Sequence, residues 1–183
     1  MIRDLLLKNR SYRSFDTSVS ISKETLVNFV DNIRYTPSTR NAQGLRFRLC
    51  YEKEECSDLL ALTKWAGALK DRHFPPQGHE PAAYIVICAK EDLFMRDVGI
   101  AAQTILLSAT EMGLGGCMIG TFDEEKLCEL LKIPLEFKPR LVLALGKPDE
   151  TVILEEAEGS LTYYRDENDV HHVPKLKTKD LLL

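Results

Sequence analysis

The segment 92–112 constrains the fold of this chain more than any other part of its sequence. We predict a helix here whose second half, from residue 98 to 109, is apolar apart from four residues, Gly99, Gln103, Thr104 and Ser108. A helix that is apolar on most sides must be covered on most sides, and a chain of 183 residues has few other elements to cover it. We therefore expect a homodimer whose interface includes this helix.

Hydrophobic patterning predicts an alternation of strands and helices around that segment. Leu45, Phe47, Leu49 and Tyr51 alternate with polar residues, which is typical of a strand with one covered face, whereas the continuously apolar 83–89 segment predicts a central strand. The other predicted strands are 117–119 and 141–145. The other predicted helices are 2–9, a helix capped by Ser22 that runs to about Arg34, 54–66, and one from near Asp123 to before Pro134. This order predicts an α+β fold with a sheet of mixed direction.

One domain spanning residues 1–183 fits this length and composition better than two domains. The breaker cluster at 75–81 is too short for a domain linker. Residues 149–183 show no strong helix period, and we expect an extended C-terminal arm that lies on its own core or on that of a partner.

Charge, hydropathy and cysteine usage exclude several classes of protein. The net charge is −4 without a sustained basic stripe, so we expect no nucleic-acid partner. No uncharged apolar run approaches the roughly 20 residues of a membrane-spanning helix, and the N-terminus lacks a signal-peptide core. The five cysteines contain no C-x-x-C pair, and we expect them to be reduced and mostly packed. These features predict a soluble, cytoplasmic protein that does not bind a membrane.

Three polar segments are candidates for ligand binding, and each also has an ordinary structural interpretation. Residues 10–13 (RSYR) would suit a phosphate, or form a solvated basic turn. The loop 37–43 (PSTRNAQ) would line a polar ligand, or be an ordinary capped turn. The glycines of 113–116 (GLGG) would allow close backbone approach to a ligand, although a helix C-cap explains the first of them.

No motif indicates a catalytic side chain or a metal. His171 and His172 are adjacent on an extended segment, so they point to opposite faces and make a poor pair of metal ligands. The sequence has no G-x-S-x-G elbow, P-loop or H-E-x-x-H motif. If the chain is an enzyme, we expect a bound cofactor to supply the reactivity.

Taken in order, these segments resemble the FMN-dependent nitroreductase family. Residues 10–15 (RSYRSF) look like its R-S-x-R-x-F signature, and residues 37–47 look like P-S-x-x-N-x-Q-P-W-x-F. The similarity continues through 97–103, 113–120 and 143–148 and so covers nearly the whole chain. It implies a three-layer fold, with a mixed central sheet flanked by helices and a C-terminal arm.

The resemblance also implies which residues bind FMN. Arg10 and Ser11 would hold the phosphate, Arg13 would reach the ribityl chain or the pyrimidine edge, and Lys175 and Lys177 would close over the phosphate. A segment against the isoalloxazine near N5 and O4 would comprise Met118, Ile119, Gly120 and Thr121. A segment contributed by the other subunit would comprise Pro37, Ser38, Thr39 and Asn41.

The activity that the resemblance implies is ping-pong hydride transfer. NADH or NADPH would reduce FMN at N5 and leave, and a nitroaromatic, quinone or similar small acceptor would take the electrons, with no catalytic side chain required. Two alternatives stay open: a specialised flavin enzyme acting on one metabolite, and a non-catalytic flavin-binding dimer module. Two departures from the family pattern are Asn9 in place of Arg, and Gly44 and Leu45 in place of Pro-Trp. A third is the short segment between helix 54–66 and strand 83–89. We do not assign side chains within 60–80 that would contact the flavin.

Overall fold

The computed structural model describes residues 1–67, 69 and 72–183. The α-helices within these residues are α1 (Ile2–Lys8), α2 (Lys23–Asp31), α3 (Lys53–Ala61), α4 (Met95–Glu111) and α5 (Glu124–Leu131). The strands are β1 (Phe15–Asp16), β2 (Leu45–Cys50), β3 (Ala83–Ala89), β4 (Gly115–Ile119), β5 (Lys138–Pro148), β6 (Val152–Glu156), β7 (Tyr164–Arg165) and β8 (His171–Lys175). Short 3-10 helices cover Asn32–Tyr35, Thr39–Asn41, Asp92–Phe94 and Thr178–Leu181.

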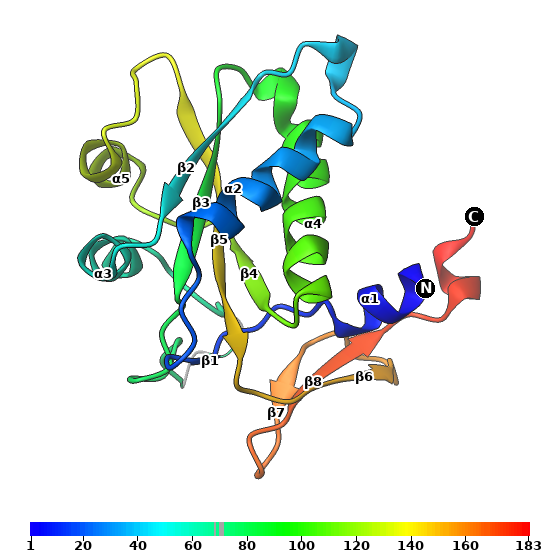
Figure 1. Ribbon diagram of the computed structural model, residues 1–183. Helices are drawn as coiled ribbons and strands as arrows, with labels where there is room; N and C mark the ends of the chain where they lie inside the picture. Colours follow the sequence, from blue (N-terminus) through cyan, green and yellow to red (C-terminus); the bar gives the residue numbers. More distant parts are fainter. Residues whose placement is uncertain (68, 70–71) are drawn as a thin grey trace.

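The main sheet is built on the long strand β5. It pairs with β1, β3 and β4, and β3 pairs in turn with β2 (Figure 1). The α+β class is confirmed, but the expectation of mixed strand direction is wrong for this sheet, because its described ladders are all antiparallel. Figure 1 shows the reason: α5 is seen end-on and so crosses the strands instead of running back along them. The chain therefore enters β5 at the end where it left β4, with Ile119 opposite Val142.

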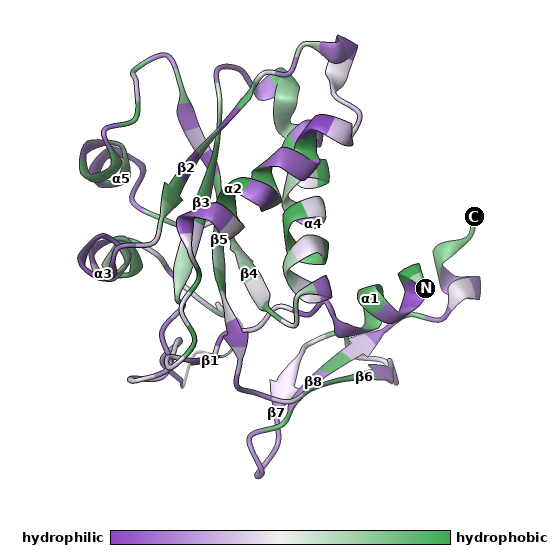
Figure 2. Cartoon of the chain, viewed as in Figure 1, coloured by the Kyte–Doolittle hydropathy of each residue, from purple (hydrophilic) through white to green (hydrophobic). Residues whose placement is uncertain are grey.

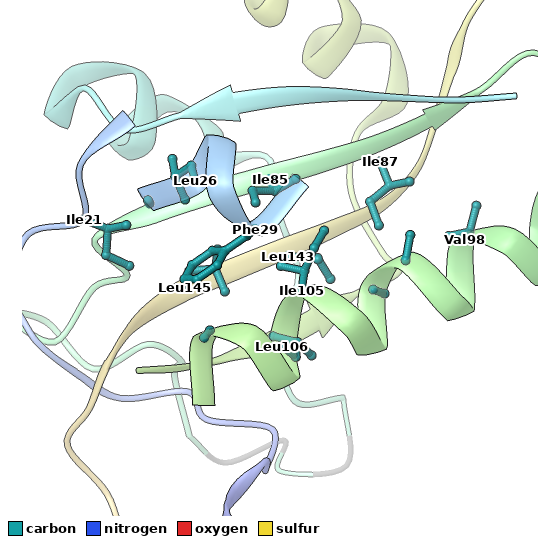
Figure 3. Close-up of a cluster of buried hydrophobic side chains, with 14 residues drawn as sticks. Ile21, Leu26, Phe29, Ile85, Ile87, Val98, Ile105, Leu106, Leu143 and Leu145 are labelled. Carbon is teal, nitrogen blue, oxygen red and sulfur yellow. The ribbon is translucent and has the colours of Figure 1, made fainter. Parts of the chain in front are cut away.

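Helices cover both faces of this sheet and make three layers. Alternate residues of β3 point to opposite faces, as the pleat of a strand requires. Ile85 and Ile87 pack with α2 and α4 in one apolar cluster (Figure 3). Tyr84 and Val86 pack on the other face in a second cluster, which includes Leu59 of α3. Every residue of β3 is buried, which confirms the prediction of a central strand.

The start of α2 follows its sequence signals. The Ser22 hydroxyl accepts a hydrogen bond from the Thr25 amide at 3.1 Å, and Ile21 and Leu26 are buried in the same apolar cluster. The α-helix ends at Asp31, and the 3-10 helix Asn32–Tyr35 completes the predicted span.

The helix predicted over 54–66 ends earlier, at Ala61. Beyond it the backbone pairs with the segment after β4: Thr63 forms an antiparallel bridge with Phe122, and the Lys64 amide donates to the Thr121 carbonyl at 2.9 Å. These long-range bonds replace the hydrogen bonds that another helical turn would have made. Residues 68, 70 and 71, within the 60–80 segment, lie outside the described residues.

The C-terminal arm is more ordered than the sequence led us to expect. It folds into a small sheet of its own, in which β8 pairs in parallel with β6 and antiparallel with β7 (Figure 1). A polar turn at 166–169 closes the β7–β8 hairpin, and the Asp166 carboxylate accepts hydrogen bonds from the amides of Asn168 and Val170. The arm buries part of itself because alternate side chains of β8 turn inward, and His171 is its most buried residue.

The long helix α4 is covered on one side by its own chain. Val98, Ala102 and Ile105 face the sheet, whereas Gly99 and Ile100 are exposed although the helix is mainly hydrophobic (Figure 2). Helix α1 has no buried residue at all. Both helices therefore leave apolar side chains exposed on the surface of the single chain.

Four of the five cysteines are buried, and Cys128 is half-buried; all five are free thiols. The prediction that they are mostly packed is confirmed. Among the described helices, none combines the length and apolar character that crossing a membrane requires.

Candidate functional site

The N-terminal basic turn is built against the start of β4. After α1 ends, Ser11 forms a parallel bridge with Gly116, and the Tyr12 amide donates to the Gly116 carbonyl at 3.0 Å. A Cβ atom on Gly115 would lie 2.5 Å from the Tyr12 ring, so the glycine permits this close approach. Gly113 has a φ of 72° directly after α4, which confirms its role in ending the helix. Gly113 and Gly115 are therefore both explained by contacts and backbone geometry within the chain.

A cavity of 390 Å³ opens beside this turn, and we call it the basic cavity. Its walls come from the turn after α1, from the side of α4, from β4 and from the small C-terminal sheet. The lining residues are Asn9, Arg10, Ser11, Arg13, Gln103, Leu106, Met118, Val152, Tyr163, His171, Val173 and Lys175. Five of them were predicted as cofactor-binding residues: Arg10, Ser11, Arg13, Met118 and Lys175. Segments far apart in the sequence therefore meet in one concave site.

Three cations of the described chain, Arg10, Arg13 and Lys175, line the basic cavity, which makes it suited to an anion. Arg13 is buried, and its guanidinium lies 5.3 Å from the centre of the Tyr163 ring. One Nη of Arg10 donates to the Leu6 carbonyl at 2.5 Å, and one Nη of Arg13 donates to the Ser11 carbonyl at 3.2 Å. Burial lowers the pKa of Arg10 from its ordinary value, yet a guanidinium keeps its charge at neutral pH.

Both arginines keep a buried nitrogen unsatisfied. Within the part of the chain that the structure describes, the Nε atoms of Arg10 and Arg13 have no hydrogen-bond partner. An unpaired buried donor is costly, more so when it is charged. An anionic group in the basic cavity would supply the missing acceptors. The residues present therefore fit the phosphate of a nucleotide-like cofactor.

The predicted ring-facing segment is only partly oriented toward the basic cavity. Met118 lines it, but the Ile119 side chain packs into the apolar cluster on the opposite face of the sheet. Gly120 and Thr121 follow the end of β4 and are exposed. Only the backbone of Ile119 remains available to a ligand on the cavity side, because strand residues alternate between the two faces.

The predicted loop around residue 39 lies elsewhere in the same chain. Pro37, Ser38 and Asn41 line a separate cavity of 240 Å³. Thr39 is held by Asp97 near the start of α4, whose carboxylate accepts from the Thr39 amide at 2.9 Å and from its hydroxyl at 2.7 Å. These two hydrogen bonds fix the loop to α4.

One chain does not bring the two predicted halves together. Asp97 holds the loop, and Leu106, nine residues further along α4, lines the basic cavity. Nine helical residues correspond to about 13 Å along the axis. The loop and the basic cavity thus lie at different levels of α4 within one chain.

Lys177 is not part of the basic cavity. Its ammonium group pairs with Glu156 at 3.0 Å on the exposed side of the small sheet, whereas Lys175 lines the cavity. Exposed ion pairs of this kind contribute little to stability, so this contact would not prevent Lys177 from binding a ligand.

Gly44 replaces the proline of the family pattern for a structural reason. A Cβ atom at this position would lie 2.5 Å from ring atoms of Phe94, in the 3-10 helix that precedes α4. The aromatic ring occupies the space that a larger residue would require. This departure reflects packing between the loop and the 3-10 helix that precedes α4.

Sequence reasoning did not assign several lining residues to the site, among them Gln103, Tyr163 and His171. Gln103 interrupts the apolar run of α4, which was a usable signal, because polar residues on a covered helix need partners. His171 was considered only as a metal ligand. The structure confirms that the two histidines face opposite ways, since His171 is buried whereas His172 stacks on Tyr164 and bonds to Glu155 at 3.0 Å.

Comparison with known proteins places this geometry in a family. The model of a family described as the nitroreductase family matches residues 6–147, which include the basic turn, the loop, α4 and β4. The chain is 26% identical to the oxygen-insensitive NADPH nitroreductase of Helicobacter pylori, over 79% of this chain and 86% of that protein. It is 25% identical to YodC of Bacillus subtilis, a candidate NAD(P)H nitroreductase, over 79% and 88% of the two chains.

Solved structures give the same result for the fold. The FMN-dependent nitroreductase of Clostridium difficile is 26% identical, with a TM-score of 0.65, over 82% of this chain and 88% of that one. A nitroreductase family protein of Streptococcus pneumoniae is 19% identical and shares the fold, with a TM-score of 0.68 over 92% and 97% of the two chains.

Proposed function

Because the chain belongs to the nitroreductase family, we propose that it is an FMN-dependent NAD(P)H oxidoreductase. The observation that carries this proposal is the basic cavity, where Arg10 and Arg13 have buried guanidinium nitrogens without partners among the described residues. The dependence of the Clostridium difficile relative on FMN and the NADPH in the name of the Helicobacter pylori relative support it.

The residues of the basic cavity would divide the binding of FMN between them. Arg10, Ser11 and Lys175 would hold the phosphate, because arginine and lysine donate charge-assisted bonds to phosphate oxygens. Arg13, deeper in the cavity, would place positive charge beside the ribityl chain or the ring edge. The backbone of residues 118–121 would lie against the ring.

When bound, FMN would supply the redox chemistry, by accepting a hydride from the nicotinamide and passing electrons to a nitroaromatic, quinone or similar acceptor in a ping-pong reaction. The protein's part is binding, orientation and charge. No side chain has to act as a general acid, because water can supply the protons. We also propose a cytoplasmic location, where NAD(P)H is available and five free thiols remain reduced.

We propose that two copies of the chain share each active site. The open apolar face of α4 would form the interface, and the loop 37–41 of one copy would reach the basic cavity of the other. This arrangement accounts for two predicted half-sites that do not meet within one chain. The oligomeric state in solution, with and without FMN, tests it directly.

The decisive experiment is to purify the protein, record its visible spectrum, and titrate it with FMN. We expect a yellow protein that NADH or NADPH bleaches and that an added nitroaromatic or quinone reoxidises. Initial rates at varied nicotinamide and acceptor should give the parallel double-reciprocal lines of a ping-pong reaction. A colourless protein that does not bind added FMN would refute the proposal. Flavin binding without reduction by either nicotinamide would favour a specialised flavin enzyme or a non-catalytic module.

A further inference from the structure

His171 is a buried histidine whose ring has no hydrogen-bond partner within the described part of the chain. It lies on β8, lines the basic cavity, and is only 2% exposed. Neither Nδ1 nor Nε2 has a hydrogen-bond partner among the residues that the structure describes. Its backbone amide, in contrast, is satisfied by the Thr151 carbonyl at 2.9 Å. The strand is therefore well anchored while the side chain is left with two unused polar atoms.

The surroundings keep this imidazole neutral. Burial, followed by the charges of Arg13 and Arg165, lowers the pKa of His171 to about 4. A neutral imidazole has one N–H donor and one nitrogen that accepts. His171 is thus not a fourth cation for an anionic ligand. Its two nitrogens require one partner that accepts a hydrogen bond and another that donates one.

His171 and Arg13 both lie beside the ring of Tyr163, and so in the same part of the cavity. The Tyr163 ring lies 5.3 Å from the His171 ring at an angle of 58°, and the Arg13 guanidinium lies 5.3 Å from the same tyrosine ring. All three residues line the basic cavity. The position that a ligand would occupy beside Arg13 is therefore also within the neighbourhood of His171.

The need for a donor identifies the chemistry of the partner. An ionised phosphate has only acceptor oxygens, so it would satisfy the imidazole N–H but leave the other nitrogen unpaired. A hydroxyl group both donates and accepts. We propose that His171 binds the polyol chain of the cofactor, taking a hydrogen bond from one of its hydroxyl groups. This inference rests on the proposed FMN function and adds to it a residue of the C-terminal sheet.

Three flavins separate the possible contacts of His171. FMN carries phosphate, polyol chain and ring; riboflavin lacks the phosphate; lumiflavin lacks the polyol chain as well. We propose to measure the dissociation constant of each by fluorescence quenching, for the wild-type protein and for His171→Phe. The matched control is His172→Phe, the neighbouring residue on the opposite face of β8. His171→Asn and His171→Gln restore a donor and an acceptor near the Nδ1 and Nε2 positions respectively.

His171→Phe should weaken FMN and riboflavin by the same factor, about fivefold to tenfold for the loss of one or two neutral hydrogen bonds, and leave lumiflavin unchanged. One of the two amide variants should recover most of the loss, and His172→Phe should bind like the wild type. The apoprotein of His171→Phe should melt no lower than the wild type, because an apolar ring replaces an unsatisfied polar one. A merely structural histidine would instead lower the melting temperature.

Unchanged binding of FMN and riboflavin by His171→Phe would overturn the inference, and so would a loss confined to FMN, which would assign the contact to phosphate. Both results leave the proposed function intact, because the wild type still binds FMN. Failure of the wild type to bind any flavin would refute the proposed function itself.

Discussion

Glu150 and Arg165 form a buried ion pair that joins the C-terminal sheet to the basic turn; their side chains are only 3% and 2% exposed. The same Glu150 carboxylate accepts hydrogen bonds from the backbone amides of Arg13 and Ser14. One acidic side chain therefore fixes both the direction of the N-terminal turn and the position of β7. Without it, two walls of the basic cavity would lose their common anchor.

Glu150→Gln should destabilise the protein by about 3 kcal/mol, because removing one charge of a buried pair leaves the other uncompensated. The measurement is urea denaturation followed by circular dichroism. Glu156→Gln, on an exposed carboxylate of β6, is the control and should cost much less. Equal stability of Glu150→Gln and the wild type would show that this pair does not anchor the arm.

Asp97 has a comparable role for the loop at 37–41. Its side chain is buried, and its carboxylate accepts from both the amide and the hydroxyl of Thr39. Asp97→Asn should lower the free energy of unfolding by about 2 kcal/mol, since hydrogen bonds to a charged acceptor are lost and an NH₂ group can face the Thr39 amide. Glu111→Gln, exposed at the end of the same helix, is the control.

If the loop completes a site in the partner, Asp97→Asn should also weaken FMN binding. FMN binding measured without denaturant, under conditions in which the variant is fully folded, separates this effect from the loss of stability. An Asp97→Asn protein that is less stable but binds FMN normally would argue against the loop as part of the flavin site.

The elements that the sequence predicted well are those decided by neighbouring residues. The continuous apolar run of β3 can only be buried, and Ser22 and Ile21 mark the start of α2 whatever the rest of the chain does. The end of α3 could not be predicted in this way. It depends on the bridge between Thr63 and Phe122, two residues that are distant in the sequence.

The candidate site was predictable in its parts but not in its assembly. Arg10, Arg13 and Lys175 came from a family resemblance, and the basic cavity brings them together. His171 was not predicted to line the site, because a histidine on an extended segment carries no local sign of burial. Only the pairing of β8 with β6 and β7 turns its side chain inward. Lys177 was expected beside Lys175, but β8 ends at Lys175, and Lys177 lies at the start of the last 3-10 helix, where it pairs with Glu156.

Arg10→Ala should weaken FMN binding by about 1.5–3 kcal/mol, because it removes a charge-assisted contact to phosphate. Riboflavin binding should change little, since riboflavin has no phosphate. Isothermal titration calorimetry with both flavins measures the difference. Lys23→Ala, which removes an exposed cation from the start of α2, should leave both affinities unchanged. Equal FMN affinities of Arg10→Ala and the wild type would remove Arg10 from the site.

His172 should make the stability of the small sheet depend on pH. Hydrogen bonding to Glu155 and then to Asp166 raises the pKa of His172, whose ring also stacks on Tyr164. A raised pKa in the folded state means that this contribution is complete below the ordinary value of about 6.5 and is lost as the pH rises through the folded-state pKa.

The matching measurement is the difference in melting temperature between the wild type and His172→Gln across pH 5 to 9. The wild type should be the more stable protein at the acidic end, and the difference should shrink as the pH rises. Taking the difference cancels the opposite effect of His171, whose lowered pKa disfavours the folded state in acid. A difference that does not vary with pH would show that the protonated His172 contributes nothing.

The open face of α4 gives the last prediction. Ile100 is 38% exposed, and a Cβ atom added to the adjacent Gly99 would meet no atom of the described residues within 4 Å. If this face is the interface between two copies, Ile100→Arg would bury unpaired guanidinium groups there and should convert the dimer to monomers, measured by light scattering during gel filtration. FMN should be lost together with the dimer, because the 37–41 loop could no longer reach the basic cavity. Leu135→Arg changes a fully exposed leucine in the connection between α5 and β5, so it should leave both dimer and flavin unchanged. A dimeric Ile100→Arg protein that retains FMN would exclude this face of α4 from the interface.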